Sequence, residues 1–283
     1  MPRPWTTIDR ADTPEGPLEL RQRGARDFVL AVGGRVLMSS AAVHTERTVA
    51  EAACRRLAGI QAPRVLIGGL GMGFTLRAAL DALAADAHVT VVEMNPVVER
   101  WCRGPLAVLT DNALGDPRVT LILGDVARAI ADTRSDTRWD AIVLDLYEGP
   151  HAATQTADDP FYGPRALAFT RRALAPNGYL AVWSEDPDIA FERRLSTAGF
   201  TPERVPPPPN GPRHVVYLAR APGGGAATGA ATSPRVSSPP PGPRDGPRVS
   251  RVSSSPAAAR DVSRVSPPAS SPEIPGRPPK RRK

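Results

Sequence analysis

Apolar residues recur in short runs between residues 65 and 219, and helix-forming polar stretches separate these runs. Each run is continuous rather than alternating, which is typical of strands buried on both faces of a sheet. The pattern predicts an α/β fold with a mostly parallel sheet, and a ligand site beyond the carboxyl ends of its strands. The expected strands are residues 65–67, 89–92, 119–123, 141–144, 179–183 and 215–219.

The residues before this region follow another pattern. Three short apolar runs are separated by Gly24 and by the pair Gly33 and Gly34, which indicate tight turns. We therefore predict a small antiparallel β-domain, followed by a helix from about residue 45 to residue 57. The three expected strands are residues 18–23, 28–32 and 35–39.

A turn rich in glycine follows the first strand of the large sheet, in the sequence VLIGGLGMGF. Without side chains, backbone N–H groups can approach a ligand closely. The last three glycines have the spacing GxGxG, whereas the dinucleotide fingerprint GxGxxG would need a glycine in place of Phe74. The spacing favours an S-adenosyl cofactor over NAD. The glycines of this loop are Gly68, Gly69, Gly71 and Gly73.

Acidic residues follow the next three strands. Glu93 ends the second strand and can accept hydrogen bonds from both hydroxyls of a ribose. Asp125 follows the third strand and Asp145 the fourth. One carboxylate after a strand is commonly the N-cap of the next helix. Three carboxylates and a glycine turn at the same edge of a sheet instead indicate a nucleoside site.

Composition separates the last part of the chain from the rest. Residues 222–283 are rich in Pro, Ser, Gly and Ala, and they hold eleven Lys and Arg residues against three Asp and Glu. Such a segment cannot bury enough apolar surface to fold. We expect an N-terminal β-domain with its linking helix over 1–58, a Rossmann-like nucleoside-binding domain over 59–221 and a disordered basic tail over 222–283. The tail would bind nucleic acid only weakly, through its charge.

Other classes of protein are not indicated. No stretch has the length of apolar sequence that spans a bilayer, and residues 1–16 lack the apolar centre of a signal peptide. We therefore expect a cytoplasmic protein without a membrane partner. The two cysteines and four histidines are scattered without ligand spacing. No metal site is expected.

These motifs resemble the spermidine synthase family of aminopropyltransferases, especially its bacterial spermidine synthase-like group, over most of residues 18–221. The resemblance implies a small β-domain before a Rossmann-like sheet of the S-adenosylmethionine-methyltransferase type. It also implies that decarboxylated S-adenosylmethionine binds between the glycine loop and Glu93. Asp125 and Val126 match the residue pair that the family places against the adenine.

The resemblance also implies a catalytic pair. In the sequence WDAIVLDLYEGP, Asp145 matches the family's first acid, and Glu148 lies at the interval of the second. An amine must lose a proton before it attacks the methylene group next to a sulfonium. Asp145 can receive that proton, Glu148 can hold an ammonium group, and Tyr147 can line the acceptor site.

The chain departs from the family pattern at two places. Gly71 stands where the family has an aspartate that binds the terminal amine of the aminopropyl group. The family's Tyr-His-Glu segment falls on Val49, Ala50 and Glu51, which leaves Glu51 and Glu46 as candidate substrate-binding residues. Both departures remove contacts to a polyamine.

Three functions stay open. The first is transfer of an aminopropyl group from decarboxylated S-adenosylmethionine to a diamine such as putrescine. The second is methyl transfer from ordinary S-adenosylmethionine, and the third is non-catalytic nucleoside binding. We expect a small-molecule amine as substrate and a homodimer as the assembly.

Overall fold

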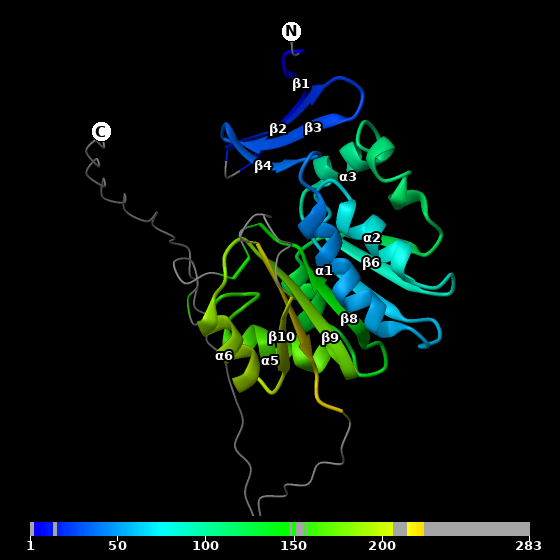
Figure 1. Ribbon diagram of the computed structural model, residues 1–283, viewed down its shortest axis with the longest axis vertical. Coiled ribbons are helices and arrows are strands. Elements are labelled where there is room, and N and C mark those ends of the chain that lie inside the picture. The colour runs from blue at the N-terminus through cyan, green and yellow to red at the C-terminus, as the bar shows by residue number, and fades with distance from the viewer. Residues whose placement is uncertain are drawn as a thin grey trace, which may run out of the picture. The chain divides into compact units, whose positions relative to one another are not determined.

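The computed structural model describes residues 3–13, 16–147, 149–150, 156, 158–205 and 214–223. Its first part is a four-stranded antiparallel sheet in the order β1-β2-β3-β4 (Figure 1). The three strands expected from the sequence are present. An additional strand, β1, pairs along β2, although its sequence TTIDRADT has only one large apolar residue. The strands are β1 (Thr6–Thr13), β2 (Gly16–Arg23), β3 (Asp27–Val32) and β4 (Arg35–Ser39).

The second part is a seven-stranded sheet in the order β10-β11-β9-β8-β5-β6-β7. The central strands β9, β8, β5, β6 and β7 are parallel, as predicted, whereas β11 and β10 join as an antiparallel pair at one edge. Four of the central strands begin within two residues of the predicted start, whereas β9 begins five residues before residue 179. The strands are β5 (Arg64–Gly68), β6 (His88–Glu93), β7 (Val119–Leu123), β8 (Trp139–Leu144), β9 (Leu174–Ser184), β10 (Thr201–Val205) and β11 (Val215–Arg220).

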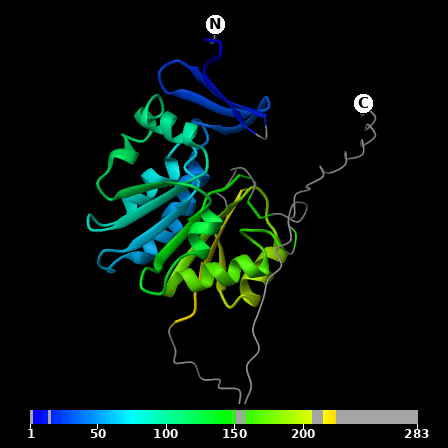
Figure 2. The ribbon, with the colours of Figure 1, turned by 180° about the vertical axis from the view of Figure 1, so that it is seen from behind.

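Helices cover both faces of the large sheet, as the opposite views in Figures 1 and 2 show. On β5, Val65 and Ile67 pack into one buried cluster, which also contains residues of the small sheet, and Leu66 packs into a second. Successive strand residues therefore face two cores, which explains the continuous apolar runs. The helices are α1 (His44–Cys54), α2 (Phe74–Ala82), α3 (Pro96–Arg103), α4 (Val126–Ala131), α5 (Pro164–Ala173) and α6 (Ile189–Thr197).

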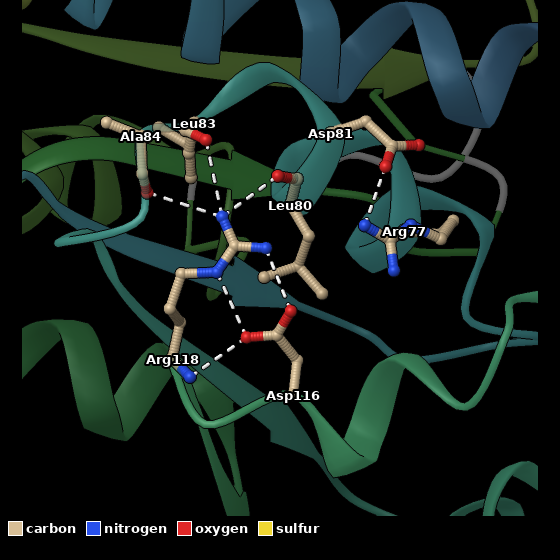
Figure 3. A network of polar contacts seen from close by, with 7 residues as sticks. All are labelled: Arg77, Leu80, Asp81, Leu83, Ala84, Asp116 and Arg118. Carbon is tan, nitrogen blue, oxygen red and sulfur yellow. Dashed lines mark hydrogen bonds and ion pairs between the residues drawn. The ribbon is translucent and has the colours of Figure 1, made fainter.

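Helix α2 is held firmly at its carboxyl end. Arg118 donates hydrogen bonds to the main-chain carbonyls of Leu80, Leu83 and Ala84 and forms an ion pair with Asp116 at 2.8 Å (Figure 3). These carbonyls belong to the helix end or to the residues just after it, where no further helical N–H groups are available. Arg118 thus caps the end of α2 that lies away from the glycine loop.

Candidate active site

The glycine loop lies between β5 and α2 and follows the course that its glycines allow. Gly69, Gly71 and Gly73 have φ values of +87°, +52° and +83°, in the region that favours glycine. At Gly69 a Cβ atom would lie 2.5 Å from the main-chain oxygen of Asp145. The loop therefore runs directly against the backbone that follows β8. At Gly68 the space for a side chain is filled by Val126 and Leu144.

Glu93 is buried at the end of β6, and both of its carboxylate oxygens are held by main-chain groups. One oxygen accepts a hydrogen bond of 2.9 Å from the N–H of Leu70 in the glycine loop, and the other accepts one of 2.8 Å from the N–H of Asn95. The carboxylate is thus fixed in place before any ligand arrives. Each oxygen can still accept a further hydrogen bond.

The pair after β7 lies beside this loop but differs in exposure. Asp125 is exposed and accepts a hydrogen bond from the N–H of Ala127, so it is the N-cap of α4. Val126 is buried and lies against the space above Gly68. The capping role considered from the sequence is therefore present, while a contact of either residue with adenine stays a prediction.

Asp145 follows β8 and belongs to a group of polar side chains. Its carboxylate accepts a hydrogen bond from the hydroxyl of Thr75, in the first turn of α2. Burial raises the pKa of Asp145 to about 6; the bond from Thr75 opposes that change, and the charge of Glu46 adds to it. Asp145 is therefore a carboxylate that can accept a proton near neutral pH.

Glu46 lies in the first turn of α1 and joins this group. The Thr75 hydroxyl also lies 3.3 Å from the main-chain oxygen of Glu46, and Thr45 donates a hydrogen bond of 3.0 Å to the Glu46 carboxylate. The pKa of Glu46 is raised, chiefly by burial. The Thr45 hydroxyl lies 3.4 Å from Nδ1 of His214, whose ring packs against Trp183. Residues from α1 and α2 and the residue just before β11 thus meet beside Asp145.

The other candidate substrate residues are placed differently. Glu51 forms an ion pair with Arg55 at 2.7 Å on the surface of α1, and no hydrogen bond within the described residues joins it to Asp145. Tyr147 is half-exposed, and the guanidinium carbon of Arg35 lies 4.9 Å from its ring centroid. Glu148 lies outside the described residues. The structure therefore brings Glu46 to Asp145 but does not bring Glu51 there.

Several residues of this group were not predicted from the sequence. Thr45 and Thr75 lie in two different helices and His214 lies just before β11, and nothing in their spacing links them. Tyr162 is buried, its hydroxyl has no hydrogen-bond partner within the described residues, and burial together with nearby acids, Asp145 among them, raises its pKa. The sequence offers one signal for this group: Thr75 is a hydroxyl residue in the first helical turn after the glycine loop.

Two other kinds of site receive no support from the described residues. No group of three or more His, Cys, Asp or Glu side chains among them is arranged to hold a metal ion. Cys54 and Cys102 are free, and burial raises the pKa of each thiol to about 12, so both are unreactive at neutral pH.

None of the helices that the structure describes is long and apolar enough to cross a membrane.

The chain is similar in sequence to two kinds of enzyme. It is 32% identical over 223 residues to polyamine aminopropyltransferase 2 of Streptomyces coelicolor, and this alignment covers 70% of this chain and 38% of the relative. It is 34% identical over 122 residues to putrescine N-methyltransferase 2 of Nicotiana attenuata, and this alignment covers 43% of this chain and 31% of the relative. The chain thus spans less than half the length of these relatives. No model of a known protein family matches it.

The fold is shared with solved spermidine synthases. The enzyme of Thermotoga maritima has a TM-score of 0.60 and 19% identity, covering 76% of this chain and 72% of that one. A spermidine synthase in complex with the transition-state analogue AdoDATO gives a TM-score of 0.60 and 18% identity with the same coverage. At these identities the likeness establishes the fold. The resemblance to the spermidine synthase-like family, indicated by the sequence motifs, is thus confirmed by similarity both in sequence and in fold.

Proposed function

We propose that this chain is an aminopropyltransferase-like enzyme that transfers an aminopropyl group from decarboxylated S-adenosylmethionine to a diamine such as putrescine. The observation that carries the proposal is the arrangement of Glu93 and Asp145 on opposite sides of one glycine loop. Glu93 is bonded to the loop at Leu70, and the backbone of Asp145 lies against Gly69. A nucleoside donor can bind at the first carboxylate while an amine is deprotonated at the second.

The loop and its neighbours fit an S-adenosyl donor. Side chains at Gly69 or Gly73 would meet the backbone of Asp145 or the side chain of Thr110, so glycine lets the loop lie close against these neighbours. Glu93 would accept hydrogen bonds from the ribose hydroxyls, and Val126 would lie near the adenine with Asp125 at its edge. The donor supplies an electrophilic carbon next to a positively charged sulfur.

Asp145 would act as the general base. An ammonium group of the acceptor gives its proton to the Asp145 carboxylate, and the freed nitrogen lone pair forms the new C–N bond. The C–S bond breaks as its electron pair returns to sulfur, so methylthioadenosine leaves as a neutral thioether without acid assistance. Thr75 keeps one carboxylate oxygen in place, and a pKa near 6 leaves Asp145 ionised yet basic at neutral pH.

The acceptor would be held in an acidic environment. Glu46 lies near enough to Asp145 to raise its pKa, and the two carboxylates together favour a cationic amine. Glu148 would add a third acidic group, as proposed from the sequence. Tyr147 would form part of the entrance, and Glu51 would act only at a distance, because Arg55 neutralises it.

Methyl transfer from ordinary S-adenosylmethionine is the second candidate. Similarity to proteins named putrescine N-methyltransferase favours it, as does Gly71, which offers no acid to bind a terminal amine. Both reactions use the same base and the same diamine, and they differ in which carbon on sulfur is attacked.

The products separate the two functions. The purified full-length protein should be incubated with putrescine and either donor, and the products analysed by mass spectrometry. Methylthioadenosine and a triamine, formed by adding an aminopropyl group to the diamine, support aminopropyl transfer. S-adenosylhomocysteine and a methylated diamine would establish methyl transfer instead, and neither product with the wild type but both donors bound would leave a binding protein. Asp145→Asn is the matched negative control.

A further inference from the structure

Met38 occupies the space beside Gly71 in the glycine loop. A Cβ atom at Gly71 would lie 2.7 Å from Sδ and 2.9 Å from Cε of Met38, so the thioether packs directly on this glycine. From the other side, the thiol of Cys102 donates to the main-chain oxygen of Gly71 at 3.3 Å. The loop is therefore held between α3 and a residue of the small sheet.

A β-bulge in β4 gives Met38 its position. Leu30 of β3 pairs with Met38 and Ala31 pairs with Val36, so Leu37 is an extra residue on β4. A bulge bends its strand and changes the direction of nearby side chains. Val36, before the bulge, is 56% exposed, whereas Met38, after it, is half-buried against the loop.

Strand β4 also reaches the residues that follow β8. The guanidinium of Arg35 lies over the ring of Tyr147, two residues after Asp145. Since β5 and β8 are neighbouring parallel strands, β4 lies across their adjacent carboxyl ends. Figure 1 shows β4 as the strand of the small sheet nearest the large one. The small sheet thus supplies part of the wall of the candidate active site.

A donor that binds as proposed above must cross the loop at residues 69–71. Its ribose would lie at Glu93, which is bonded to Leu70, and its reactive carbon would face Asp145, whose backbone touches Gly69. The chain that begins at this carbon would then extend towards the next loop residue, Gly71, and towards the thioether of Met38 that covers it.

We propose that Met38 covers the far end of the donor's chain on sulfur and leaves the site able to accept either S-adenosyl donor. This inference rests on the proposed function. The two donors differ in one carboxylate at the end of the substituent on sulfur. A neutral thioether neither attracts an ammonium group nor repels a carboxylate, so the wild type discriminates between the donors by less than about 10-fold. A charged side chain at position 38 would interact with that end at short range.

The test measures the affinity of both donors by calorimetry in the full-length protein. Met38→Glu should shift the ratio of affinities towards decarboxylated S-adenosylmethionine by about 10-fold or more, and Met38→Lys should shift it towards ordinary S-adenosylmethionine by a similar factor. Val36→Glu and Val36→Lys are the matched controls, since they place the same charges on the same strand away from Gly71. These controls should change the ratio by less than about 3-fold.

A second measurement needs no substitution. Either donor should slow oxidation of Met38 by hydrogen peroxide, followed by peptide mass spectrometry, with buried Met72 as the unreactive reference. Unchanged affinity ratios in both Met38 variants, or a Met38 that bound donor does not protect, would overturn the inference while leaving the proposed function in place. A wild type that binds neither donor would overturn the proposed function itself and the inference with it.

Discussion

The hydroxyl of Thr75 donates to the carboxylate of Asp145 and also contacts the main-chain oxygen of Glu46. One side chain in the first turn of α2 therefore links the candidate base to the helix that carries the second acid. The hydrogen bond favours the ionised form of Asp145 and so opposes the effect of burial on its pKa. This relationship makes the pH dependence of the proposed reaction testable.

Replacing Thr75 should change the pH at which activity appears. Thr75→Val removes the hydroxyl, so the pKa of Asp145 should rise above 6 and the acid limb of the pH–rate profile should move to higher pH. Thr75→Ser keeps a hydroxyl and should keep the profile. A profile that is identical in wild type and Thr75→Val would show that Asp145 does not set the acid limb.

Asp145→Asn should separate chemistry from donor binding. The amide cannot accept a proton, so turnover should fall by about 100-fold or more, while donor affinity should stay within about 3-fold of the wild type. Steady-state rates and calorimetry measure the two effects. An unchanged rate with a verified amine substrate would exclude Asp145 as the base.

The same variant should alter stability in a direction that depends on pH. Because the folded-state pKa of about 6 exceeds the ordinary value of 3.8, ionising Asp145 costs stability as the pH rises from about 4 to above 6. Asp145→Asn should therefore raise Tm by a few degrees at pH 7.5 and have little effect near pH 4. A lower Tm at pH 7.5 would mean that the carboxylate stabilises the fold.

Glu93→Gln should weaken donor binding by about 10-fold or more. The substitution removes the charge from the hydrogen bonds to the ribose. It also replaces one carboxylate oxygen by an NH₂ group, which cannot accept the hydrogen bond that a main-chain N–H now donates there. Glu99→Gln, on the surface of α3 and paired with Arg103, is a matched control and should leave affinity unchanged. Equal affinities in both variants would remove Glu93 from the donor site.

The contacts of Arg118 at the end of α2 should contribute more to the free energy of unfolding than an exposed ion pair between residues two positions apart. Arg118→Ala should lower the free energy of unfolding by about 1–3 kcal/mol, because it frees Asp116 and three carbonyls at the helix end. Arg134→Ala breaks the exposed pair with Asp136 and should change stability by less than about 0.5 kcal/mol. Urea unfolding of both variants provides the comparison.

The sequence predicted the central elements well and the acceptor side poorly. The runs that became β5, β6, β7 and β8 are visible because their residues face two cores, and the glycine spacing reflects backbone angles that other residues rarely adopt. Contacts between distant elements carry no such local signal. Thr45 and His214 meet although 169 residues separate them, and Met38 reaches Gly71 from another sheet.

The domain boundaries at residues 58 and 221 stay predictions, as do the homodimer and the weak binding of nucleic acid by the tail. A truncated chain that ends at Ala221 should keep the activity and the Tm of the full chain, because the tail sequence offers no apolar face for packing. A Tm several degrees lower after truncation would show that residues beyond 221 contribute to the fold.

The two main-chain bonds to Glu93 have a consequence for the sugar that the site selects. Each carboxylate oxygen already accepts one N–H, from Leu70 or Asn95, and each retains capacity for one more donor. A ribose offers two neighbouring hydroxyls, whereas a 2′-deoxyribose offers one. Because this carboxylate is buried, a deoxyribose would leave one of its oxygens without a second hydrogen-bond donor, and water could not easily replace the missing hydroxyl. If Glu93 binds the donor sugar as proposed, we therefore expect ribonucleosides to bind more tightly than 2′-deoxyribonucleosides, because the two main-chain N–H groups leave one acceptor place on each oxygen.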